Sequence, residues 1–222
     1  MDTPPRAWPF RLREHLRVPL HVNALALATS AGLTAVLGLV YWAAAARTYT
    51  PAQVGTQSAL ISAMLLVGGM AEVGADSLLI RFLPVAGRAG RRLAARLYVI
   101  ATCAGIVGAL VFALGTSVWA PALHFIRTDN WWLVGFVIST VVACLYAVQD
   151  SVLTGARRAP WVPVENGLVS LSKIVLVLIF GGFVGAGGIF GSWNIPTTLA
   201  VAIVTLIVFA RLLPTQRDAA PQ

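Results

Sequence analysis

Residues 51–84 read PAQVGTQSALISAMLLVGGMAEVGADSLLIRFLP, an apolar stretch that nevertheless carries Glu72, Asp76 and Arg81. Ionisable groups inside a membrane span cost at least a few kcal/mol each unless they face protein or water. Glu72 and Asp76 are four residues apart, so a continuous helix would place them on one face. We therefore expect a second span with one wet face, unless the acids lie at headgroup level and are simply solvated. Counting back by threes and fours extends this face to Gly69, Leu65, Ser62 and Ser58.

The composition is that of an integral membrane protein. Of the 222 residues, 58% are hydrophobic and 11% are charged, against about a quarter charged in a soluble domain. The mean hydropathy is +0.82, and several apolar runs reach the roughly twenty residues that cross about 30 Å of hydrocarbon. The period-two alternation of a transmembrane β-barrel is missing. We expect an all-α polytopic bundle, because helices satisfy the backbone hydrogen bonds that lipid cannot.

Six transmembrane helices are expected between a basic, interfacial arm at residues 1–21 and a polar cytoplasmic tail at residues 214–222. The first apolar run is longer than the core of a cleaved signal peptide, so we interpret it as the first span. The linker between the last two spans is itself apolar and defines their boundary least well. The expected spans are residues 22–46, 53–83, 93–119, 131–153, 163–184 and 192–213.

Basic residues are distributed unevenly between the connections. Nearly all of the arginines lie in the N-terminal arm, in the links after the second and fourth spans and in the tail, whereas the other side has only Arg47 and Arg127. This asymmetry predicts that both termini are cytoplasmic. The net charge of +8 then meets anionic lipid headgroups, and no motif indicates a nucleic-acid partner. Arg157 and Arg158 fit orientation signals and lipid-phosphate contacts better than substrate ligands.

Polar side chains from several spans are expected at similar depths and could line a cavity. Glu165 is expected at a depth similar to theirs. Lys173 could meet an anionic substrate group while an acid pairs with it or carries a proton. The alternative is that Lys173 snorkels to the interface or is held in a structural ion pair. The candidate cavity residues are Ser62, Glu72, Asp76, Arg81, Asp150, Asn166, Ser170 and Lys173.

An enzyme is not expected, because the sequence has no visible catalytic set. It has neither a Ser-His-Asp arrangement nor a Gly-rich phosphate loop ending in Lys. Cys103 and Cys144 fall within apolar runs, and the three histidines are scattered outside the spans. Neither a disulfide framework nor a metal site is therefore expected.

Several short stretches resemble one transporter family. Thr50-Pro-Ala-Gln-Val-Gly55 precedes a long span that contains Ala71-Glu-Val-Gly74. Later, Gln149-Asp-Ser-Val-Leu-Thr-Gly155-Ala-Arg-Arg158 leads to Val162-Pro-Val-Glu-Asn166. Over about residues 20–213 the chain resembles the polysaccharide exporter family, the O-antigen and teichoic-acid type flippases. Their superfamily also holds the MATE drug exporters and the lipid II flippase.

The resemblance implies two six-helix lobes around a hydrophilic cavity in the bacterial cytoplasmic membrane. Alternating access would move a lipid-linked saccharide, and coupling to Na+ or H+ is typical, with no other cofactor. This chain would supply the N-terminal lobe alone, so a second lobe or a homodimer is expected. The alternatives are half of a MATE-like exporter of cationic drugs, or a non-transporting scaffold or remnant in envelope polysaccharide assembly.

Overall fold

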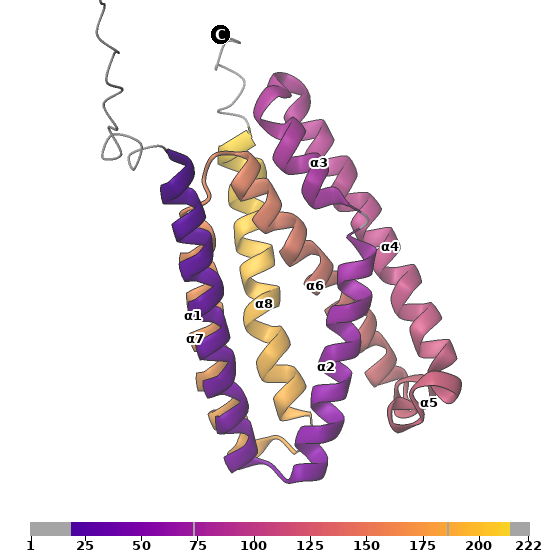
Figure 1. The fold of residues 1–222 in the computed structure, drawn as a ribbon. Coiled ribbons are helices and arrows are strands. Elements are labelled where there is room, and N and C mark those ends of the chain that lie inside the picture. The colour runs from indigo at the N-terminus through magenta and orange to yellow at the C-terminus, as the bar shows by residue number, and fades with distance from the viewer. Residues whose placement is uncertain (1–18, 73, 186, 214–222) are drawn as a thin grey trace, which may run out of the picture.

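The computed structural model describes residues 19–72, 74–185 and 187–213, and every regular element in these ranges is helical. Short 3-10 turns cover Leu83–Val85, Gly87–Ala89 and Pro121–Leu123, and a π-helical turn, Val208–Leu212, continues the last helix. Figure 1 shows one elongated bundle. The α-helices are α1 Pro19–Thr48, α2 Pro51–Ala71, α3 Ala75–Phe82, α4 Gly90–Trp119, α5 Phe125–Thr128, α6 Asn130–Gly155, α7 Trp161–Phe183 and α8 Gly188–Ile207.

Six of the described helices are long and apolar enough to cross a membrane, namely α1, α2, α4, α6, α7 and α8 with its π-helical extension. The expectation of an all-α polytopic bundle is therefore confirmed. The start of α1 and the end of the π-helical turn after α8 lie at the same end of the bundle, together with α3 and the connection from α6 to α7 (Figure 1). The connection from α1 to α2 and helix α5 lie at the other end, as an even number of spans requires.

The predicted continuous helix over residues 53–83 is wrong. Helix α2 ends at Ala71, and α3 begins at Ala75 after Gly74, whose φ of 71° lies in the left-handed region. Glycine adopts this conformation without steric cost, and a residue in it ends a right-handed helix. Glu72 and Asp76 therefore stand on either side of a break, and the periodicity that put them on one helix face does not apply.

The start of α2 is set by its own sequence. The Thr50 hydroxyl accepts a hydrogen bond from the Gln53 backbone N–H at 3.4 Å, and the Gln53 side chain accepts one from the Thr50 N–H at 3.0 Å. This reciprocal pair is a capping box, and Pro51 occupies the first helical position, where no N–H is needed. The tight link from α1 to α2 follows from this chemistry.

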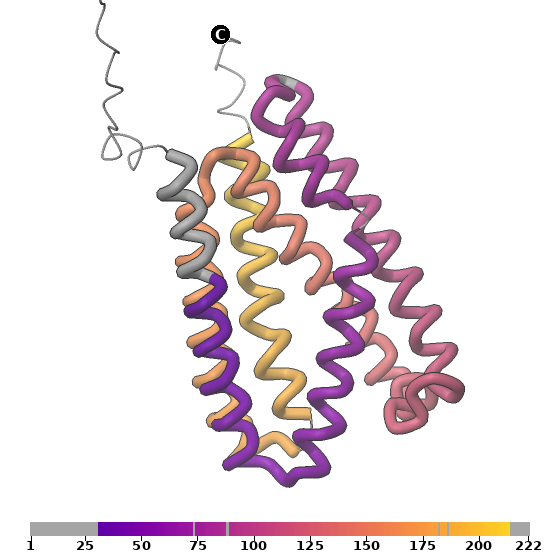
Figure 2. Tube along the Cα trace, in the orientation of Figure 1, coloured from indigo at the N-terminus to yellow at the C-terminus, as the bar shows by residue number. Residues whose placement is uncertain are grey.

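Close packing between helices relies on small residues. A buried stripe along α4 consists of small side chains and faces α6, where Gly105 contacts Val141. Figure 2 traces α4 and α6 side by side along much of their length, and α1 runs beside α7 in the same way. Small residues let helix backbones approach closely, and the resulting van der Waals packing is one of the forces that hold helices together in lipid. The stripe is Ala94, Ala101, Gly105, Ala109 and Ala113.

We expect Gly155→Ala to lower the stability of the bundle. A Cβ at Gly155 would lie 2.7 Å from the backbone oxygen of Leu79 on α3, and backbone cannot move aside as a side chain can. Overpacking of this kind costs about 1–3 kcal/mol. The matched control is Gly55→Ala, where a Cβ would meet nothing within 4 Å. Thermal unfolding in detergent should show a lower midpoint for the first variant and an equal or higher one for the second; equal midpoints would contradict the close approach.

Candidate functional site

A group of polar side chains lies inside the bundle where α6, α7 and α8 meet; we call it the polar cluster. Its hub is Gln149 of α6, which is wholly buried. The Gln149 amide donates from Nε2 to Glu165 Oε1 at 2.5 Å, and its oxygen accepts from the Thr205 hydroxyl at 3.2 Å. One side chain thus links three helices. The cluster consists of Tyr146, Gln149, Asp150, Glu165, Asn166 and Thr205.

The second half of the polar cluster is centred on Asn166. Its amide donates from Nδ2 to Asp150 Oδ2 at 3.4 Å, and its oxygen accepts a hydrogen bond from the Tyr146 hydroxyl. Tyr146, Gln149 and Asp150 are spaced at i, i+3 and i+4, so α6 presents them on one side. Their partners Glu165 and Asn166 come from the first turns of α7.

The two acids of the cluster lack compensation. Asp150 Oδ1 and Glu165 Oε2 are buried oxygen atoms without a hydrogen-bond partner, and neither carboxylate has a basic partner among the described residues. Asp150 also interacts with the negative charges of Glu165 and Glu72. Burial of an unpaired charge costs several kcal/mol. The arrangement is therefore suited to take up a proton or another cation.

Glu72 approaches the cluster from outside the apolar span of α2. It is half-buried at the end of that helix. Desolvation, with a smaller contribution from Asp76, raises the pKa of the Glu72 carboxyl group. Of Glu72 and Asp76, Glu72 is the acid that interacts electrostatically with Asp150.

Other candidates from the sequence lie apart from the cluster. Asp76 is half-buried in the first turn of α3, and Arg81 is exposed, with its guanidinium carbon 5.5 Å from the centre of the Phe82 ring. Ser170 is half-buried on α7. Ser62 is exposed, as are Leu65 and Gly69 beside it, so the small and polar stripe of α2 faces away from the described helices.

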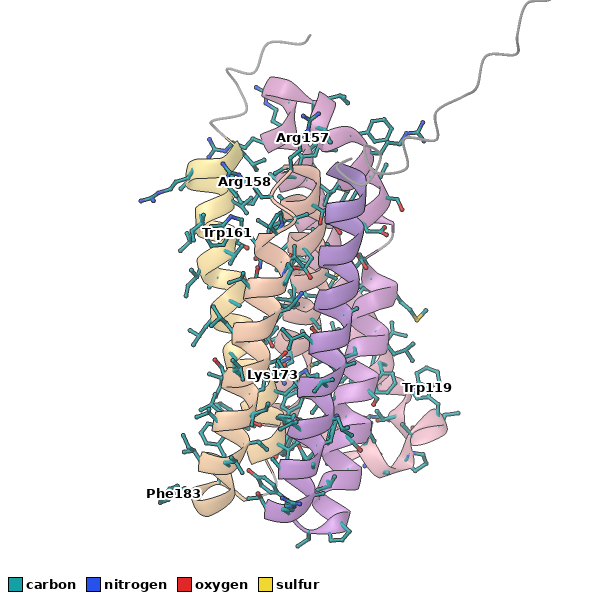
Figure 3. The ribbon with its side chains drawn as sticks, turned by 60° about the vertical axis from the view of Figure 1, so that its left-hand side comes forward. Trp119, Arg157, Arg158, Trp161, Lys173 and Phe183 are labelled. Atoms are coloured by element: carbon teal, nitrogen blue, oxygen red, sulfur yellow. The ribbon has the colours of Figure 1, made fainter. Side chains whose placement is uncertain are left out.

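Lys173 has a different environment from the acids. Its ammonium nitrogen lies 4.0 Å from the centre of the Trp193 ring on α8, a cation–π contact. Trp193 in turn packs edge-on against Tyr41 of α1, with ring centres 5.1 Å apart. Figure 3 labels Lys173 near the middle of the bundle and Arg158 near one end. Lys173 follows Glu165 by eight residues, a rise of about 12 Å along α7, so the structure does not bring the predicted cation to the predicted acids.

Sequence reasoning missed three members of this region. Gln149 had a usable signal, because it precedes Asp150 within an apolar run. Thr205 and the buried Tyr98 of α4, which lies close to Thr205, had none, because isolated polar residues of this kind occur throughout such helices. Within the described ranges no group of three or more His, Cys, Asp or Glu side chains could hold a metal ion.

Comparison with protein-family models, curated proteins and solved structures gives no match for this chain. The polar cluster and the motifs within the sequence are consequently the features that bear on function. Among these motifs, the stretch from Gln149 to Arg158 and the one from Val162 to Asn166 contain four members of the cluster, Gln149, Asp150, Glu165 and Asn166.

We expect Gln149→Leu to destabilise the bundle. Leucine is an apolar residue of comparable size, and it leaves the Glu165 carboxylate and the Thr205 hydroxyl without their shared partner. A buried polar group that loses its partner costs about 1–3 kcal/mol. The control is Ser172→Ala, because the exposed Ser172 hydroxyl bonds only to the Leu168 carbonyl of its own helix. Denaturant titration in mixed micelles should separate the two variants; a Gln149→Leu protein as stable as Ser172→Ala would show that the bridge contributes nothing.

Proposed function

We propose that this chain is one lobe of a transporter in the bacterial cytoplasmic membrane and that its polar cluster takes up the coupling cation. The observation that carries the proposal is the pair Asp150 and Glu165 on α6 and α7, each of which has one buried carboxylate oxygen without a hydrogen-bond partner and no basic partner among the described residues. Acids inside membrane helices are expensive, and they are retained where they line ion or proton pathways.

The hydrogen bonds of the cluster suit this role. Gln149 and Asn166 each hold one oxygen of an acid and leave the other without a partner. A proton needs one such oxygen, whereas Na+ needs several oxygen ligands at once, so H+ is the simpler coupling ion here. The cluster is nearer to the end that carries Arg157 and Arg158, which charge asymmetry assigns to the cytoplasm.

The proposed cargo is a lipid-linked oligosaccharide or polysaccharide precursor. This part of the proposal rests on the motif resemblance, in which two lobes alternate access to a shared cavity. The exposed stripe of Ser62 and Gly69 on α2 supports a second lobe or second copy, because polar and small residues on a span favour contact with another helix over contact with lipid. The lobe would then rock against its partner around the cargo.

A MATE-like exporter of cationic compounds is the second candidate. It is favoured by the negative character of the cluster and by the position of Lys173, whose ammonium group is engaged by Trp193. Carboxylates without a cationic neighbour bind positive ligands rather than a pyrophosphate. A non-transporting scaffold is the third hypothesis. It predicts that changes in the cluster have no effect on the flux of any cargo.

We expect the double variant Asp150→Asn with Glu165→Gln to lose transport in proteoliposomes that contain the full chain, assayed alone and with a co-expressed second lobe. The flux of a lipid-linked saccharide should fall by about tenfold or more, equivalent to about 1.4 kcal/mol in the barrier, and its dependence on an imposed proton gradient should disappear. The control is Asp129→Asn, the same change at the exposed cap of α6 at the other end, where asparagine caps equally well.

The same vesicles separate the alternatives. Flux of a cationic dye without flux of the saccharide would replace the cargo proposal by the exporter. Saccharide flux that is unchanged in the double variant would remove Asp150 and Glu165 from the mechanism. Absence of flux for both cargoes, with and without a partner lobe, would support the scaffold and overturn the transporter proposal.

A further inference from the structure

A long groove runs between α7 and α8 on the outside of the bundle, with a volume of about 890 Å³. This is within the roughly 300–1,000 Å³ of ordinary ligand sites. Its walls are almost entirely aliphatic, and many of these side chains are exposed. Its apolar wall consists of Val164, Leu168, Leu171 and Val175 of α7 with Leu199 and Ile203 of α8.

The length of the groove matches one leaflet of a bilayer. On α8 its lining extends from Ile195 to Ile207, a rise of about 18 Å. Half of the roughly 30 Å hydrocarbon core is about 15 Å. An extended acyl chain can therefore lie along the groove from the interface to the middle of the membrane.

One end of the groove is basic. Arg158 and Arg211 both line it there, together with the exposed ring of Trp161. These side chains come from the connection before α7, from the start of α7 and from the π-helical turn after α8. Tryptophan and arginine are the side chains that favour the headgroup region of a bilayer. Figure 3 labels Arg158 and Trp161 at the same end of the bundle.

The turn after α6 positions Arg158. The backbone N–H of Arg158 donates to Leu153 O at 2.8 Å, and that of Arg157 donates to Thr154 O at 3.0 Å. This is the hydrogen-bond pattern of a Schellman motif, in which the residue at Arg157, with φ of 59°, is usually glycine. The turn fixes the backbone of Arg158 at the mouth of the groove. The next residue, Ala159, is buried.

We propose that this groove binds one anionic phospholipid, with its phosphate between Arg158 and Arg211 and one acyl chain along the apolar wall. The charge of the headgroup complements the two guanidinium groups, which bind phosphate strongly and often through two hydrogen bonds. Glu165 also lines the groove, but it comes about one helical turn after Trp161 along α7, and its Oε1 is held by Gln149. The phosphate therefore faces the arginines rather than this carboxylate. The inference does not depend on the proposed transport.

Native mass spectrometry of the detergent-solubilised full chain, titrated with phosphatidylglycerol or phosphatidylcholine, tests this site. The wild-type protein should retain one phosphatidylglycerol, and the Arg158→Ala with Arg211→Ala variant should bind it about tenfold more weakly, a loss of about 1.4 kcal/mol. Leu168→Trp with Ile203→Trp, which fills the apolar wall, should lose it as well. The charge-matched control, Arg91→Ala with Arg92→Ala, removes two exposed arginines from the start of α4 at the same end and should bind like the wild type.

Circular dichroism checks that each variant is folded before its titration. If the arginine variant does not fold, the wall variant, which keeps both arginines, still tests the site. Equal loss in the Arg91 and Arg92 control would overturn the specific site in favour of general attraction to anionic lipid. Equal retention of phosphatidylcholine would overturn the phosphate–arginine contact. The lipid proposal would also be overturned if a second copy of the chain occupied the groove. In that case the wild-type protein would be a dimer, and the tryptophan variant would abolish the dimer without changing lipid binding.

Discussion

The hydrogen bond from Gln149 to Glu165 is the interaction around which this bundle is arranged. It joins α6 to α7 at the centre of the polar cluster, within helices that are otherwise mainly apolar, and the same amide reaches α8 through Thr205. In such surroundings a broken polar contact has no water to replace it. Helices α2, α3, α4 and α8 also pack against α6, so the helix that carries the hub also fixes the positions of its neighbours.

The acids of the cluster lower the stability of the bundle, whereas the packing of its helices raises it. Small residues along α4 bring helices close and favour a tightly packed interior. Asp150 and Glu165 are placed inside that interior with one oxygen each unpartnered. Proteins retain such unfavourable groups mainly where a ligand or proton compensates them, which is why the cluster, rather than Asp76 or the exposed Arg81, is the centre of the proposed function.

The break between α2 and α3 separates two roles that the sequence had combined in one helix. Before Gly74, α2 is a membrane span with an outward stripe that includes Ser62. After it, α3 packs at the basic end, where the Leu79 carbonyl meets Gly155 of α6. Glu72 lies at the junction, and its carboxylate interacts electrostatically with Asp150 of the cluster. Glu165 also lines the groove between α7 and α8, so α7 contributes to both the polar cluster and the groove.

The sequence by itself determined the class of this protein, its six apolar helices and the uneven placement of its arginines. Whether a segment can cross the hydrocarbon core as a helix depends only on its length and composition. The sequence also placed Asp150 and Asn166 among the candidate residues, since polar side chains within apolar runs are conspicuous. Only the tertiary structure decided which of them meet: Gln149 and Thr205 joined the acids, and Lys173 was engaged by Trp193. Helix rotation and the left-handed Gly74 decide these contacts, and both depend on packing between residues far apart in the chain.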